Sequence, residues 1–133
     1  ENGIRVCVLK DHAYLNWVAL KNGDDVVIWT DHNNSKDFYF GIIKNNKSQH
    51  PFTLKNLVVA IRHSEAKARG ITDGLEDLDC FSHHPKLPGM FYHPLGGMFL
   101  HGSRKYPLKP EEFTKLTPSQ VVKIAYSALE LEK

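Results

Sequence analysis

Histidines are concentrated in one stretch of the sequence. Four of the eight lie between residues 80 and 106, where Ser103, Arg104 and Lys105 also occur. Histidine changes its charge near neutral pH, so two of them can act as general base and general acid. Arginine and lysine can stabilise charge on a phosphoryl group. The segment therefore predicts metal-independent cleavage of phosphodiesters. The candidate acid–base residues are His83, His93 and His101.

The same segment is open to two other interpretations. Cys80-x-x-His83, followed by His93 and His101, supplies four residues of the types that bind zinc. The first spacing is typical of a metal site, but the later spacings match no common zinc pattern, so we assign no metal ligands and expect no cofactor. The remaining interpretation is that these histidines are surface or hydrogen-bonded loop residues.

Basic residues form the second candidate site. Residues 44–69 carry a net charge of +5, and residues 80–110 carry +4. Lys55, Arg62 and Arg69 are spaced by seven, so they form one stripe on a helix, semi-exposed beside its apolar face. Such a stripe suits phosphate contacts, and Lys44, Lys47 and His50 extend it. The alternative is that the side chains only border a buried face. The residues predicted to hold phosphate are Lys55, Arg62, Arg69, Arg104 and Lys105.

The elements that must position these residues follow from periodicity and turn signals. Alternating or β-rich runs predict strands over 4–9, 25–30 and 38–44, the last two forming a hairpin. Met90–Tyr92 and Met98–Leu100 are expected to form a second hairpin or a folded loop. In the first hairpin we expect Phe38 and Phe40 to be buried and Tyr39 to be exposed.

Apolar residues at helical spacing predict helices over 12–21, 54–68 and 118–131. A short helix over 110–116 is also expected, and Thr117-Pro118-Ser119-Gln120 is a capping box with proline at the first helical position. Residues 71–110 are otherwise predicted to be irregular. The order of elements favours an α+β fold: residues 1–133 form a single domain, in which two main amphipathic helices pack on a small antiparallel sheet, with a long loop-rich segment.

Composition sets limits on these interpretations. The chain has 133 residues, 41% of them hydrophobic and 24% charged, which is typical of a globular domain. No apolar run approaches the ~20 residues that cross a bilayer, so no membrane partner is expected. The two cysteines are too few for a disulfide framework, which weakly favours an intracellular location. No nucleotide-loop, dinucleotide-binding or hydrolase-triad motif occurs.

Two classes of function remain. The first is a domain that binds nucleic acid or another phosphorylated ligand, with metal-independent nuclease activity as an extension. The second is a non-catalytic protein-interaction module, an inhibitor or adaptor, that binds a protein partner through the Pro/Gly/His-rich loop 80–106. Its expected contact residues are Met90, Phe91, Tyr92 and Met98. The sequence does not decide whether the protein is an enzyme.

Overall fold

A six-stranded sheet is the centre of the structure. A computed structural model describes residues 4–10, 23–32, 37–45, 52–94, 97–103 and 107–130. The strands are β1 (Val6–Lys10), β2 (Val26–His32), β3 (Phe38–Lys44), β4 (Ser82–His84), β5 (Leu87–Tyr92) and β6 (Met98–His101). Their order across the sheet is β1-β2-β3-β6-β5-β4. The α+β class is as predicted, but β1 and β2 run parallel, so the sheet is mixed rather than antiparallel.

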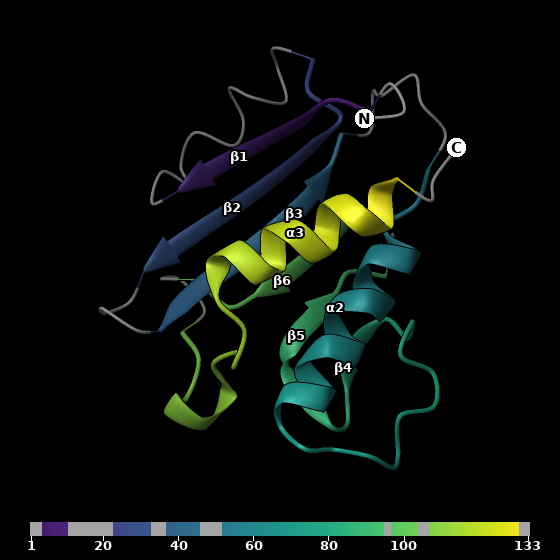
Figure 1. The fold of residues 1–133 in the computed structure, drawn as a ribbon, viewed down its shortest axis with the longest axis vertical. Helices are drawn as coiled ribbons and strands as arrows, with labels where there is room; N and C mark the ends of the chain where they lie inside the picture. The colour runs from purple at the N-terminus through teal and green to yellow at the C-terminus, as the bar shows by residue number, and fades with distance from the viewer. Residues whose placement is uncertain are drawn as a thin grey trace.

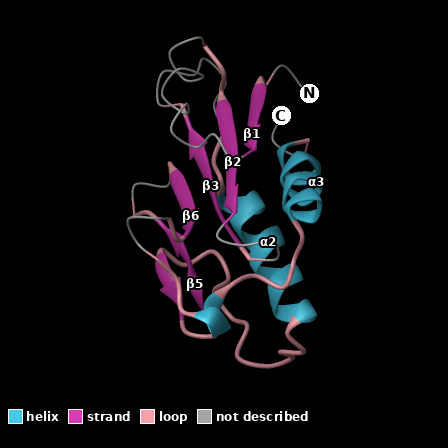
Figure 2. Ribbon diagram, turned by 90° about the vertical axis from the view of Figure 1, so that its left-hand side faces the viewer, coloured by secondary structure: helices cyan, strands magenta, loops and turns pink. Residues whose placement is uncertain are grey.

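Two helices cover one face of this sheet. They are α2 (Lys55–Ala68) and α3 (Pro118–Leu129). Figure 1 views them in front of the strands, and Figure 2, turned by 90°, shows both on the same side. The capping box of α3 is confirmed, since the Gln120 amide donates to Thr117 Oγ1 at 3.2 Å and the Thr117 amide to Gln120 Oε1 at 2.8 Å. No helix in the described residues is long and apolar enough to cross a membrane.

Side chains alternate between the two faces along each strand. On the helix face, the buried side chains of the strands pack against α2 and α3 in the main core. They include Ile28, Phe40, Ile42, Phe99, Met90 and Tyr92. We call the opposite side the second face. The strand register aligns one row of residues on it, namely Trp29, Gly41, Leu100, Phe91 and His83.

The second face has a smaller core of its own. Trp29, Tyr39 and Phe113 are buried together, and Leu100 and Leu108 pack against them. The prediction that Tyr39 is exposed is therefore wrong, since only 4% of it is accessible, whereas Phe38 and Phe40 are buried as predicted. The reason is that Phe113, which is distant in sequence, places its ring 5.3 Å from the Tyr39 ring.

Other sequence-based boundaries need correction. Residues 71–110 were predicted to be largely irregular, but they contain β4, β5 and β6; the expected β5–β6 hairpin is confirmed. The helix expected over 110–116 is only the three-residue 3₁₀ helix η2 (Pro110–Glu112). The helix predicted over 12–21 lies outside the described residues.

Gly41 allows the second face to accommodate a large side chain. It pairs with Trp29 across β2 and β3, and a Cβ atom on Gly41 would overlap the Trp29 indole. The indole thus lies directly over the glycine, where any larger residue would displace it. This close approach explains a glycine in the middle of an otherwise β-rich strand.

We expect Gly41→Ala to lower the free energy of unfolding by about 1–3 kcal/mol because the added methyl group overpacks the site. Urea denaturation measures this loss. Trp29→Phe in the same background removes the clashing part of the indole, so the double variant should lose less stability than the two single losses combined. Strictly additive losses would contradict this account.

Candidate functional site

A pocket of about 570 Å³ opens on the second face beside β5 and β6. Its volume is within the range of small-ligand sites. It is lined by His83, Gly89, Phe91, His93, Leu100, Gly102, Ser103, Pro107, Leu108 and Glu112. Two of the three predicted acid–base residues, His83 and His93, are thus brought to the same pocket.

Strand pairing explains how this happens. His83 lies opposite Phe91 across β4 and β5, and His93 follows Phe91 by two residues, so all three side chains lie on the same face. The Phe91 ring lies 5.2 Å from the His83 ring and 6.1 Å from the His93 ring, centroid to centroid. Phe91 and His93 are partly buried, whereas His83 is exposed. The result is one phenyl ring in contact with two imidazoles.

The far wall of the pocket is formed by the chain that follows β6. Gly102 has a φ of 66°, a conformation that favours glycine, and a Cβ there would meet Leu108 and Tyr39. Glu112 is held by the backbone, because its Oε1 accepts a hydrogen bond from the Lys109 amide at 2.9 Å. The sequence analysis missed Glu112 and Leu108, since nothing in the sequence indicates that residues 107–112 return to this face.

His101 is separated from the other two predicted acid–base residues. Its side chain points to the helix face, where its ring stacks on Phe40 at 4.9 Å. The Thr114 amide donates to His101 Nε2 at 2.9 Å, so Nδ1 carries the proton and donates to the Gly89 carbonyl at 2.8 Å. Burial lowers the pKa of His101 to about 4, which keeps the ring neutral. His101 therefore joins two backbone segments.

His84 is used in the same way. It is 3% exposed; its Nδ1 accepts from the Lys86 amide at 3.1 Å, and its Nε2 donates to the Glu76 carbonyl at 2.9 Å. Thus two of the four histidines in the segment hold the backbone, and the other two face the pocket. The acid–base prediction for His83 and His93 stays a prediction.

Arg62 is in the interior, so its predicted semi-exposed position is wrong. Its exposed fraction is 0%. The guanidinium donates to the carbonyls of Leu78, Cys80, Ser82 and Met90 at 2.7–3.2 Å. It also lies 5.6 Å from the centroid of the Phe99 ring. Burial lowers the pKa of Arg62. The segment at 78–82 covers Arg62, and the seven-residue spacing gives no sign of that segment.

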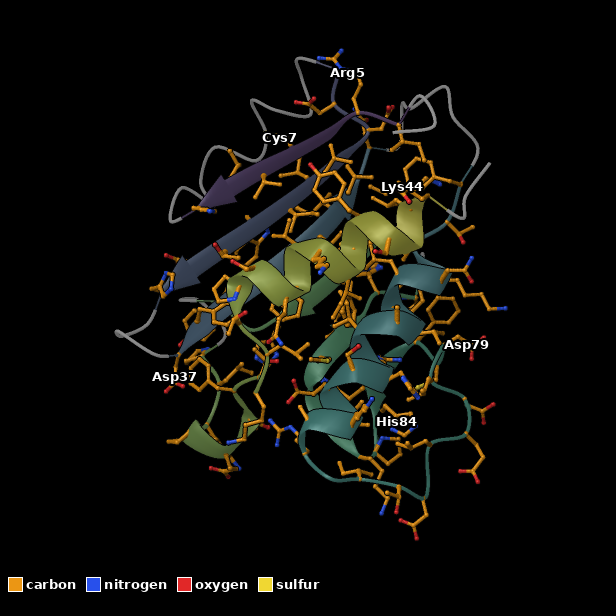
Figure 3. All side chains as sticks on the ribbon, in the orientation of Figure 1. Arg5, Cys7, Asp37, Lys44, Asp79 and His84 are labelled. Atoms are coloured by element: carbon orange, nitrogen blue, oxygen red, sulfur yellow. The ribbon has the colours of Figure 1, made fainter. Side chains whose placement is uncertain are left out.

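The other predicted phosphate residues are dispersed. Arg69 donates to the carbonyls of Glu111 and Phe113 and forms an ion pair with the buried Glu65. Lys55 is exposed and pairs with Asp79 at 3.4 Å; Figure 3 labels Asp79 beside α2. Arg104 and Lys105 lie outside the described residues.

The proposed extension of the basic stripe does not lie near the pocket either. Lys44 lies over the Phe52 ring at 5.2 Å. Figure 3 shows Lys44 toward one end of the molecule and His84, the neighbour of His83, toward the other. Lys47 and His50 lie outside the described residues. Among the basic residues of 44–69, the structure thus contradicts only the exposure of Arg62, and phosphate binding by the others stays a prediction.

The structure places Cys80, one of the four residues of zinc-binding type, in contact with Arg62. Its carbonyl and its Sγ both accept from Arg62. Cys7 and Cys80 are free thiols rather than a disulfide. In the described part of the chain, no group of three histidine, cysteine or acidic residues is placed to hold a metal ion.

The contact patch expected for a protein-interaction module is divided between the two faces. Met90 and Tyr92 are buried in the main core, so their predicted exposure is wrong. Phe91 and Met98 remain partly accessible. Strand alternation explains this division, because residues 90 and 92 face the helices and residue 91 does not.

Comparisons with known proteins give no family for this chain. A scan against models of protein families, a search of curated proteins and a search of solved structures each found no match. Function must therefore be argued from the pocket and its residues.

Replacing Arg62 by Met should lower the free energy of unfolding by about 3 kcal/mol, because four inward-facing carbonyls lose their donor. Arg62→Lys, which keeps a donor, should lose less. Lys55→Met on the same stripe is the matched control and should change stability by less than about 0.5 kcal/mol. Urea denaturation makes the comparison, and equal losses in Arg62→Met and Lys55→Met would contradict the proposed role of Arg62.

His101 should make stability depend on pH. Its pKa is lowered from 6.5 to about 4, so the unfolded chain binds the proton more tightly. The stabilisation is complete above about pH 6.5 and is lost as pH falls from there to about 4, a change of about 3 kcal/mol. His101→Gln should lack this component, so the difference between the two stability curves isolates it.

Nitrogen-15 NMR of the imidazoles tests the same point without unfolding the protein. His101 should keep a protonated Nδ1 and an unprotonated Nε2 at pH 5.5. A His101 ring protonated on both nitrogens at that pH would contradict the assignment.

Proposed function

We propose that the pocket on the second face binds single-stranded nucleic acid, with a base stacked near Phe91. The observation that carries this proposal is the contact of two imidazoles with one partly buried phenyl ring on a sheet surface. Bases stack on such aromatic side chains when they are unpaired. The volume of about 570 Å³ supports a ligand of nucleotide size rather than a duplex.

The composition of the pocket supports this ligand class. Leu100, Pro107 and Leu108 give it apolar walls, while His83, His93, Ser103 and the carboxylate of Glu112 supply its polar groups. Ser103 is followed directly in the sequence by Arg104 and Lys105, the two predicted phosphate residues of the segment. A base would be bound by the apolar part, and a phosphate by the polar groups.

The protein-interaction module is the weaker alternative. Two of its four expected contact residues, Met90 and Tyr92, belong to the main core. A partner surface would have to be formed around Phe91 and Met98 alone. Binding to a protein but not to nucleic acid would favour it over the present proposal.

Fluorescence anisotropy with labelled single-stranded RNA, single-stranded DNA and duplex DNA tests the proposal at about 50 and 200 mM salt. We expect both single strands to bind, the duplex to bind more weakly, and affinity to fall with salt as phosphate contacts are lost. Phe91→Leu keeps the apolar volume but removes the aromatic ring, so Kd should rise about tenfold, since stacking contributes about 1–3 kcal/mol per base.

Phe81→Leu is the matched control, because Phe81 is 50% exposed and does not line the pocket. It should bind as the unmodified protein does. Absence of binding at the lower salt, or equal losses in the Phe81 and Phe91 variants, would overturn the proposal.

A further inference from the structure

Two histidines in one pocket suit a reaction as well as binding. Of the four in the segment, His84 and His101 use both ring nitrogens to hold backbone groups. His83 and His93 instead line the pocket on the same side as Phe91. We infer that the protein cleaves single-stranded RNA, with His83 and His93 as the acid–base pair, an inference that rests on the proposed binding of single strands.

The argument for RNA rather than DNA concerns the nucleophile. Acid–base catalysis by positioned side chains contributes about 10²–10⁴-fold. A nucleophile within the substrate adds the advantage of an intramolecular reaction, with effective molarities of about 10⁵–10⁸ M. RNA carries such a nucleophile, the 2′-hydroxyl next to each phosphodiester. A pocket in which two imidazoles are the acid–base groups therefore gains most from RNA.

The reaction can be written with all atoms accounted for. One imidazole, neutral, accepts the proton of the 2′-hydroxyl as O2′ attacks phosphorus. The other, protonated, donates its proton to the departing 5′-oxygen. A P–O2′ bond forms and the P–O5′ bond breaks, which leaves a 2′,3′-cyclic phosphate on one fragment and a 5′-hydroxyl on the other. No oxidant, reductant or water is consumed in this step.

Phe91 links the two imidazoles in space. The phenyl ring contacts both imidazoles, at 5.2 Å and 6.1 Å between centroids. A base stacked near Phe91 would hold its own ribose and phosphate close to both rings. The ring thus positions the substrate, and the two imidazoles are the catalytic residues of the inference.

The test uses the full chain and a 5′-labelled RNA oligonucleotide, in buffer with EDTA, analysed by gel electrophoresis and mass spectrometry. We expect fragments that end in a 2′,3′-cyclic phosphate. His83→Asn and His93→Asn should each lower the cleavage rate of the bound RNA at least 100-fold, measured at protein concentrations above the Kd of each variant so that weaker binding does not contribute. His63→Asn, an exposed histidine on α2, is the control and should cleave normally.

The substrate is varied in parallel. DNA of the same sequence, and RNA with a 2′-deoxy nucleotide at the cleaved position, should bind but remain intact. Bound RNA that stays uncut would overturn this inference and leave the proposed binding function standing. Failure to bind would overturn both. Cleavage that persists in both histidine variants, or that extends to DNA, would also overturn the assignment of the reaction to this pair.

Discussion

Much of the remaining structure depends on the hydrogen bonds that the buried guanidinium of Arg62 donates to backbone carbonyls. A charge without exposure to water is costly unless hydrogen bonds replace its hydration. Here four backbone carbonyls do so, three of them from Leu78, Cys80 and Ser82. Ser82 has a φ of 62°, which is unfavourable for a residue other than glycine, and its carbonyl is one of the acceptors. The approach of the chain to β4, and so the position of His83 opposite Phe91, depends on this contact.

The same side of α2 organises a second irregular segment one and two turns further on. Glu65 is 1% exposed and accepts from the Thr114 hydroxyl and from the Lys115 amide at 3.1 Å. Arg69 donates to the Glu111 and Phe113 carbonyls, and His101 accepts from the Thr114 amide. This segment carries Phe113 onto the second face and Leu116 into the main core. The helix expected to bind phosphate thus fixes the two segments that flank the pocket, and its phosphate binding stays a prediction.

Much of this fold could be predicted because its signals are local. The capping box at Thr117 and the apolar spacing of 54–68 each lie within one element, and both helices form close to where they were expected. The alternation in Met90–Tyr92 also predicts that Phe91 and His93 share one face of the sheet. Met90 and Tyr92 must then lie on the opposite face. The partners of Arg62 lie 16 to 28 residues away and are carbonyls, which every residue has. No sequence pattern distinguishes such a buried arginine from one that binds phosphate.

Charge is used internally at three of the predicted phosphate positions. Arg62 and Arg69 donate to backbone carbonyls, and Lys55 pairs with Asp79. The second face holds a local pocket where an aromatic ring contacts two imidazoles. The proposed ligand, one or two unpaired nucleotides, would be selected there by stacking and by the groups next to the phosphate.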